Sequence, residues 1–164
     1  MKRTSIWVCL MMVVVVLLSQ GASASGNVLI GVVNVDLVIE QSQAGQLANN
    51  DLMALITSWQ SQLDELEATI LEMQEQLGED ASTPELDELV GRYQTMAVEA
   101  EYAIQQRADE LYQLLLQDIA AVVNLVGARD GYTMIAEASS IFYYEAQVDV
   151  TSEIIREYDR LLNE

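Results

Sequence analysis

The sequence predicts an α+β protein, in which a long antiparallel α-helical coiled-coil hairpin protrudes from a small β body. Strand-like blocks occupy residues 28–34 near the beginning, and 132–136 and 141–144 near the end. Residues from about 45 to 127 have helical patterning that is broken once, at 78–84. Strands so far apart in the chain can pair only if the segment between them leaves the sheet and returns to it, as a helical hairpin does.

The first 24 residues have the three parts of an export signal. Lys2 and Arg3 supply the positive start, residues 6–18 the apolar stretch, and residues 22–24 a small-residue cleavage site. The apolar stretch is shorter than the about 20 residues of a membrane span, so cleavage is favoured over a retained anchor. Because Cys9 is the only cysteine and lies inside this segment, cleavage would leave an exported protein without a thiol.

Without its signal the chain would be strongly acidic, with five Arg and 26 acidic residues, neither Lys nor His, and a formal charge of −21. We interpret this charge as one that keeps an exported protein soluble, without a specific role. A nucleic-acid partner is excluded because phosphate binding needs a basic patch, and anionic lipid is disfavoured for the same reason.

The residues that remain in the chain give little support to an enzyme, because the abundant carboxylate pairs lie on predicted solvated helix faces. The lack of Cys and His after cleavage excludes thiol and imidazole catalysis and His-ligated zinc. Neither a Gly-rich phosphate loop nor a calcium-loop motif is present in the sequence. We therefore expect a protein that is not an enzyme and that uses no metal and no cofactor.

The outgoing half of the predicted hairpin repeats apolar residues in alternating steps of three and four over about four heptads, which is typical of a coiled-coil seam. The returning half carries a matching series with a polar break at Arg107. Acidic residues without basic neighbours fill the outer positions, as on a solvated helix face. The predicted seam consists of Leu52, Ile56, Trp59, Leu63, Leu66, Ile70, Met73, Leu77, Leu86, Val90, Tyr93, Ala97, Ala100 and Ile104.

The tip of the hairpin lies at residues 78–84. Gly78 suits a left-handed helix end, and Thr83 followed by Pro84 fits an N-cap and the first helical position. Ser82 with Glu85 forms an alternative capping box, so two starts remain open for the returning helix.

Residues 114–126 are apolar nearly all round the helix, and such a helix is buried on every side. The few predicted strands leave open sheet edges and little core, so we expect the chain to oligomerise through its β body. The predicted oligomer core consists of Val32, Ile119, Val122, Val123, Val126, Ile135 and Phe142.

Arg129 and Asp130 follow this helix. One interpretation is a functional ionic site at this pair. The favoured interpretation is a helix end and turn with an exposed ion pair. A last helix is predicted at residues 154–162, with Asp149 and Thr151 both as candidate caps.

Residues 30–36, Ile-Gly-Val-Val-Asn-Val-Asp, resemble the first strand of the OmpH-like (Skp) family of periplasmic chaperones. The blocks 129–137, 141–144 and 149–155 are similar to the family's closing strands and to the start of its last helix. With the acidic arm between them, the resemblance covers nearly all of residues 28–162.

The resemblance implies a homotrimer with a barrel-like β body and three helical arms around a cavity. That cavity would hold unfolded outer-membrane proteins in the periplasm without ATP. In this interpretation residues 25–44 and 115–164 form the trimerising body, and residues 45–114 form the arm.

The chain departs from the family in its charge. Its arm contains only Arg92 and Arg107 as basic residues, so we expect no lipopolysaccharide site of the kind proposed for the family. The competing interpretation is a non-enzymatic coiled-coil adaptor or spacer of the cell envelope, because such a protein needs the same arm.

Overall fold

The computed structural model describes residues 28–78 and 83–164. The predicted export signal and most of the predicted tip therefore lie outside the described residues. Two short 3₁₀ turns, η1 (Ala138–Ser140) and η2 (Ala146–Val148), precede the last helix. In chain order the strands and α-helices are β1 (Ile30–Val33), α2 (Val35–Gln41), α3 (Gln43–Leu77), α4 (Pro84–Asp130), β2 (Met134–Glu137) and α5 (Thr151–Leu162).

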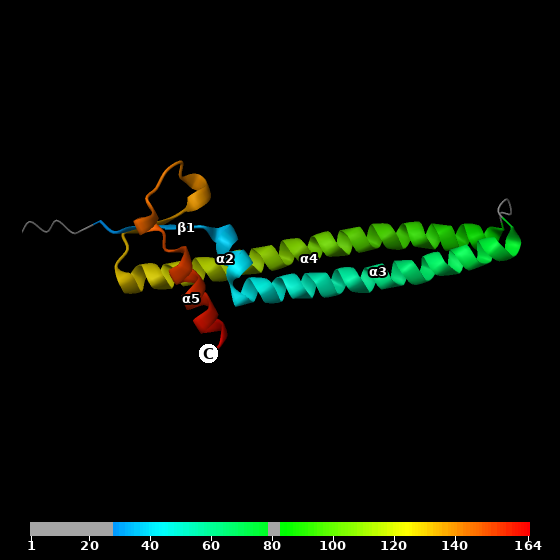
Figure 1. The fold of residues 1–164 in the computed structure, drawn as a ribbon, viewed down its shortest axis with the longest axis horizontal. Helices are drawn as coiled ribbons and strands as arrows, with labels where there is room; N and C mark the ends of the chain where they lie inside the picture. Colours follow the sequence, from blue (N-terminus) through cyan, green and yellow to red (C-terminus); the bar gives the residue numbers. More distant parts are fainter. Residues whose placement is uncertain (1–27, 79–82) are drawn as a thin grey trace, which may run out of the picture.

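The helices α3 and α4 lie side by side and antiparallel, and they project together from a small body that holds the other elements (Figure 1). Helix α4 begins as the sequence predicts, with Pro84 in its first turn and the Thr83 hydroxyl accepting a hydrogen bond from Leu86 N at 3.2 Å. Gly78 is the C-cap of α3, and its φ of 91° favours glycine although its ψ of 152° lies outside the left-handed helical region.

Helix α2 is an element that the sequence analysis missed. Its N-cap is Asn34, whose side-chain oxygen accepts a hydrogen bond from Leu37 N at 3.0 Å, and Asp36 lies favourably in its first turn. The helix is only 7 residues long, too short for a helical period to stand out beside the strand before it. Its Val38 is fully buried in the body.

The sheet has two parallel strands, with Ile30 paired to Met134 and Val33 to Glu137. A single bridge joins Val32 to Asp149 on the other side of β1. Both sides of β1 are thus occupied, and the free edge lies on β2.

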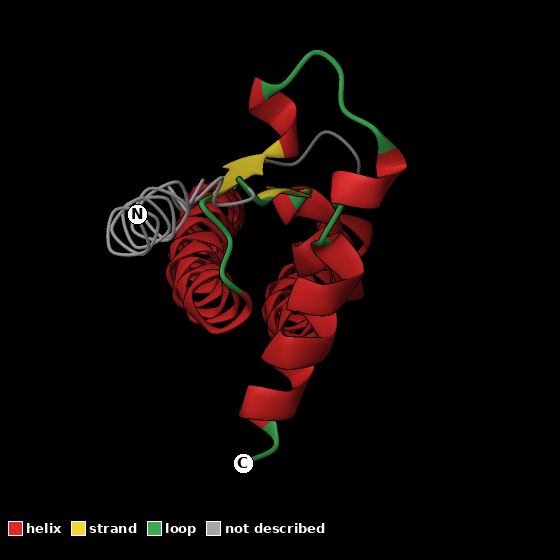
Figure 2. Cartoon of the chain, turned by 90° about the vertical axis from the view of Figure 1, so that its left-hand side faces the viewer, coloured by secondary structure: helices red, strands yellow, loops and turns green. Residues whose placement is uncertain are grey.

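The prediction of a strand at residues 141–144 is wrong for the single chain. These residues form an extended segment between η1 and η2 that projects away from the helices (Figures 1 and 2). Since β1 is already flanked on both sides, the segment has no strand to pair with there, and it does not return along the edge of β2. Phe142 within it is fully exposed.

The core of the body is built by one chain. Ile119, Val122 and Val126 of α4 pack there with side chains from β1, α2 and α5. We predicted these three residues in an oligomer core, but their burial requires no second copy. The buried set comprises Val33, Val38, Leu115, Ile119, Val122, Val126, Val150, Ile154 and Tyr158.

Helix α5 starts three residues earlier than predicted, and neither Asp149 nor Thr151 is its N-cap. Val150 holds that position without a side-chain cap. The Thr151 hydroxyl instead accepts a hydrogen bond from Asn34 N at 2.9 Å, and Asp149 accepts one from Thr151 N at 2.8 Å. The Thr151 side chain thus joins the end of β1 to the start of α5, whereas the Asp149 side chain makes a local bond at the start of α5.

Candidate functional site: the helix pair and its attachment to the body

The predicted seam residues lie mostly between α3 and α4. Leu66, Leu86 and Ala100 are buried, whereas Leu77, the last residue of α3, is exposed. Two helices cover each other on one side only, so most seam side chains keep contact with solvent. The half-buried ones are Leu52, Ile56, Trp59, Leu63, Ile70, Met73, Val90, Tyr93, Ala97 and Ile104.

The polar break at Arg107 is filled by ion pairs. Its guanidinium donates to Asp51 of α3 at 2.6 and 2.8 Å and to Glu110 of its own helix at 2.7 Å. The hydrogen bond to Asp51 is the main cause that raises the pKa of Arg107, followed by the bond to Glu110. Exposed pairs add little stability, so this contact chiefly fixes which residues of α3 and α4 face each other.

The predicted oligomer-core residues are divided between the inside and the outside of the body. Val32, Ile119, Val122 and Val126 are each buried, while Val123 and Ile135 are half-buried and line a shallow depression beside β2. Among the seven, only Phe142 is fully exposed.

The start of α3 is held by a buried joint. Ser42 ends α2 and caps α3, is fully buried, and accepts a hydrogen bond from Gly45 N at 3.1 Å. A carboxylate oxygen of Asp159 in α5 accepts a second hydrogen bond, from Gln43 N at 2.8 Å. Because these bonds satisfy amides of the first turn of α3, the last helix helps to set the direction of the helix pair.

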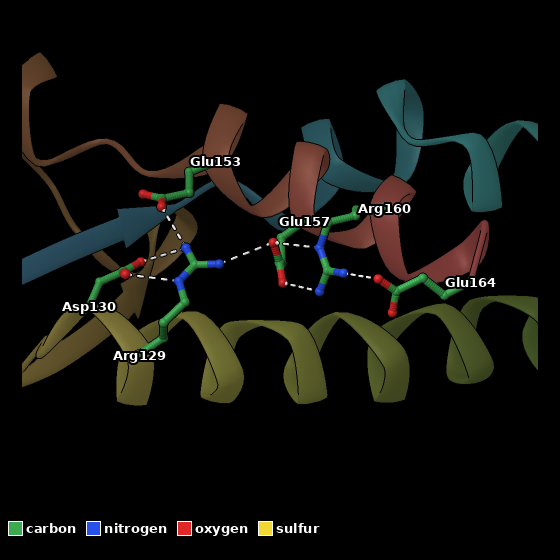
Figure 3. Close-up of polar contacts among 6 residues, drawn as sticks. All are labelled: Arg129, Asp130, Glu153, Glu157, Arg160 and Glu164. Carbon is green, nitrogen blue, oxygen red and sulfur yellow. Dashed lines mark hydrogen bonds and ion pairs between the residues drawn. The ribbon is translucent and has the colours of Figure 1, made fainter.

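A network of charges joins the end of α4 to α5 (Figure 3). Arg129 contacts Asp130 at 2.7 Å, Glu153 at 3.0 Å and Glu157 at 3.1 Å. Gly131 follows in the left-handed conformation, so the segment is a helix end and turn, the favoured interpretation, and its Arg129 also pairs with acidic residues of α5. The acidic partners on α5 were not predicted from the sequence, although their spacing of four residues places them on one helix face.

Glu157 lies at the centre of this network. Its hydrogen bond to Arg160, at 2.8 Å, is the main cause that lowers its pKa, and the contact with Arg129 acts in the same direction. A carboxylate with a lowered pKa stabilises the fold above its unfolded-state pKa and loses that contribution as the pH falls through its folded-state pKa. The contribution of Glu157 is therefore present at neutral pH and lost below about pH 4.

We expect Glu157→Gln to be less stable than the original protein at pH 7, and the difference to vanish on acidification through the pH range below about 4. Urea unfolding of both proteins across a pH series measures the difference between their free energies of unfolding. Because the other carboxylates are present in both proteins, their effect cancels in this difference. Glu164→Gln is the control, because Glu164 is largely exposed at the chain end. A difference that grows as the pH falls would contradict the assigned role of Glu157.

Two large apolar side chains of α4 lie outside the seam. Val98 is 67% exposed and Tyr102 is 69% exposed. A helical period of 3.6 residues places both opposite the buried Ala100, on the outer face of α4. Neither residue was predicted as part of a site from the sequence, although apolar residues outside the heptad positions were the available signal.

The described residues hold no cluster of three or more His, Cys, Asp or Glu side chains that could bind a metal ion. By length and composition alone, α4 is apolar enough to cross a membrane. Its apolar Ile119, Val122 and Val126 pack in the body core.

The match to a family model covers residues 29–158 and identifies the chain as a member of the OmpH-like family of outer membrane proteins, as its sequence motifs suggested. The fold is similar to that of an OmpH-like protein from Caulobacter crescentus CB15, proposed to be an outer membrane chaperone. That likeness has a TM-score of 0.51 at 10% identity and covers 81% of this chain and 85% of the other. No curated protein matches the sequence.

Proposed function

We propose that the protein is a periplasmic, ATP-independent holdase that binds unfolded outer-membrane proteins between the helical arms of a homotrimer. The arm is residues 45–114, and residues 25–44 and 115–164 form the body. Membership of the OmpH-like family and a long helix pair with exposed apolar side chains support this proposal. Residues 1–24 would direct export and then be removed.

The free surfaces of the body support association between chains, which the proposed trimer requires. The outer edge of β2 has no partner strand within the described chain, and the extended segment at 141–144 exposes Phe142 and Tyr143. Unpaired strand edges and exposed aromatic rings are features that association of chains covers. In this proposal, residue 142 is the predicted oligomer-core position that meets another copy most directly.

We expect Phe142→Ser to dissociate the trimer without unfolding the chain. Phe142 is fully exposed in the single chain, so its loss removes apolar contact only between copies. Sedimentation velocity measures the assembly and circular dichroism the fold. Val98→Ser, which removes an exposed side chain from the arm, is the control and should remain trimeric.

An unchanged trimer after Phe142→Ser would contradict this role of the extended segment. A stable monomer of the original sequence would contradict the trimer itself.

Clients are expected to contact the arm at many places. An unfolded chain has no fixed shape, so the arm would hold it through many weak apolar contacts. Photo-crosslinking residues at Gln74 and Gln94, both exposed on the arm, should each capture unfolded client, and one at Gln117 in the body should capture little. Capture at a single arm position would favour the envelope adaptor, which binds one folded partner.

The proposed protein is not an enzyme and needs no cofactor, and its acidic arm has no lipopolysaccharide site. Only two Arg residues lie within residues 45–114, and one of them, Arg107, is engaged by Asp51 and Glu110. Polyanions would meet fifteen acidic residues in the same stretch.

A further inference from the structure

The outer face of α4 near its midpoint combines exposed apolar groups with uncompensated negative charge. Val98 and Tyr102 lie one helical turn apart and project away from α3, because the buried Ala100 faces the seam. Glu99 and Glu101 lie about 100° to either side of Ala100 and so flank the apolar pair. Both carboxylates are exposed, and within the described chain neither has an ion-pair partner.

The rest of the arm does not neutralise this charge. Residues 45–114 contain fifteen acidic residues and two Arg. Arg107 is engaged by Asp51 and Glu110 on the seam side of the helices. A segment that carries Lys or Arg beside apolar residues would match the face in both respects, whereas an anionic segment would be repelled.

We propose that this face, formed by Val98, Glu99, Glu101 and Tyr102, docks unfolded polypeptide segments in which apolar residues stand beside Lys or Arg. The inference rests on the proposed holdase function and names the class of segment that the arm prefers. The apolar side chains of the segment cover Val98 and Tyr102, and its cations meet the two carboxylates. The Tyr102 ring also accepts a cation over its face.

A second copy of the chain is a poor occupant for the same face. Two copies would bring together arms of the same strong negative charge, and like charges placed face to face oppose association. The face lies on the projecting helix pair, away from the open strand edge of the body (Figure 1). A cationic segment of another protein therefore fits the charge better than another arm does.

Two matched peptides test the preference with the full protein. One is a labelled peptide of about 20 residues in which Leu alternates with Lys, and the other carries Glu in place of each Lys. Fluorescence anisotropy should show binding of the Lys peptide and much weaker binding of the Glu peptide. The affinity for the Lys peptide should fall in about 1 M salt, where the Debye length is about 3 Å.

Variants locate the binding on the face. Glu99→Gln with Glu101→Gln should weaken binding of the Lys peptide about three- to tenfold, the loss of two exposed charge contacts. Glu85→Gln with Glu88→Gln removes the same charge from exposed positions near the start of α4 and should change the affinity less. Val98→Ser with Tyr102→Ser should weaken binding about tenfold or more, because the apolar contact is lost.

Equal binding of the two peptides, or equal effects of the two Glu pairs, would overturn the inference. If the protein suppresses aggregation of unfolded clients but shows no charge preference, the proposed function stands and this inference is wrong. If the protein binds the Lys peptide at this face but suppresses no aggregation, the inference about the face stands and the proposed holdase function is wrong.

Discussion

Replacing Gly45 with Ala is expected to destabilise the protein by about 3 kcal/mol or more, at the upper end of single substitutions. An added Cβ would lie 1.6 Å from the carbonyl oxygen of Ile39 in α2. That oxygen belongs to backbone and cannot rotate away, so α2 and α3 must separate. Separation would also disturb Ser42, whose buried hydroxyl caps the start of α3.

Gly91→Ala is the matched control for this substitution. Gly91 also lies inside a helix, but a Cβ there meets nothing within 4 Å. Alanine is the better helix former, so we expect this variant to gain up to about 1 kcal/mol. Urea unfolding followed by circular dichroism compares the two, and a Gly45→Ala protein as stable as the original would show that the joint at Ser42 is not rigid.

Val122→Asp is expected to unfold the body, with a loss of about 3 kcal/mol or more. The Val122 side chain is 4% exposed and packs in the core of the single chain. An aspartate there must bury a carboxylate without a partner, or take up a proton and leave its polar atoms unsatisfied. Val98→Asp places the same substitution on the exposed face of the same helix and should change stability by about 0.5 kcal/mol or less.

The two variants also separate folding from assembly. If Val122→Asp gave a folded monomer in sedimentation and circular dichroism, Val122 would belong to a contact between copies and not to the core of one chain. We expect instead a loss of helical signal together with a loss of assembly.

The helices of the arm could be predicted from the sequence because their signals are local. The heptad of apolar residues indicates a helix pair, and Thr83 with Pro84 marks where α4 begins. The arrangement of the body could not be predicted in the same way. Helix α2 is too short for a clear period, and the hydroxyl of Thr151, an apparent helix cap, is taken by Asn34 from 117 residues away.

The strand at residues 141–144 shows a different limit. Its aromatic and β-branched composition favours a strand, but a strand also needs a partner edge. Both sides of β1 are occupied and this segment does not return along the free edge of β2, so local propensity alone does not make it a strand. The outer face of α4 was missed for the opposite reason: Val98 and Tyr102 do not fit the heptad and could be assigned only once the seam had been located.

Suppression of aggregation tests the holdase proposal most directly. Several unrelated outer-membrane β-barrel proteins are diluted from urea without ATP, with and without the purified protein, and light scattering is followed over time. We expect scattering to fall for most of these clients at about one trimer per client. Scattering that stays unchanged for every client, or that falls for one client alone, would contradict a general holdase and favour an adaptor with a single partner.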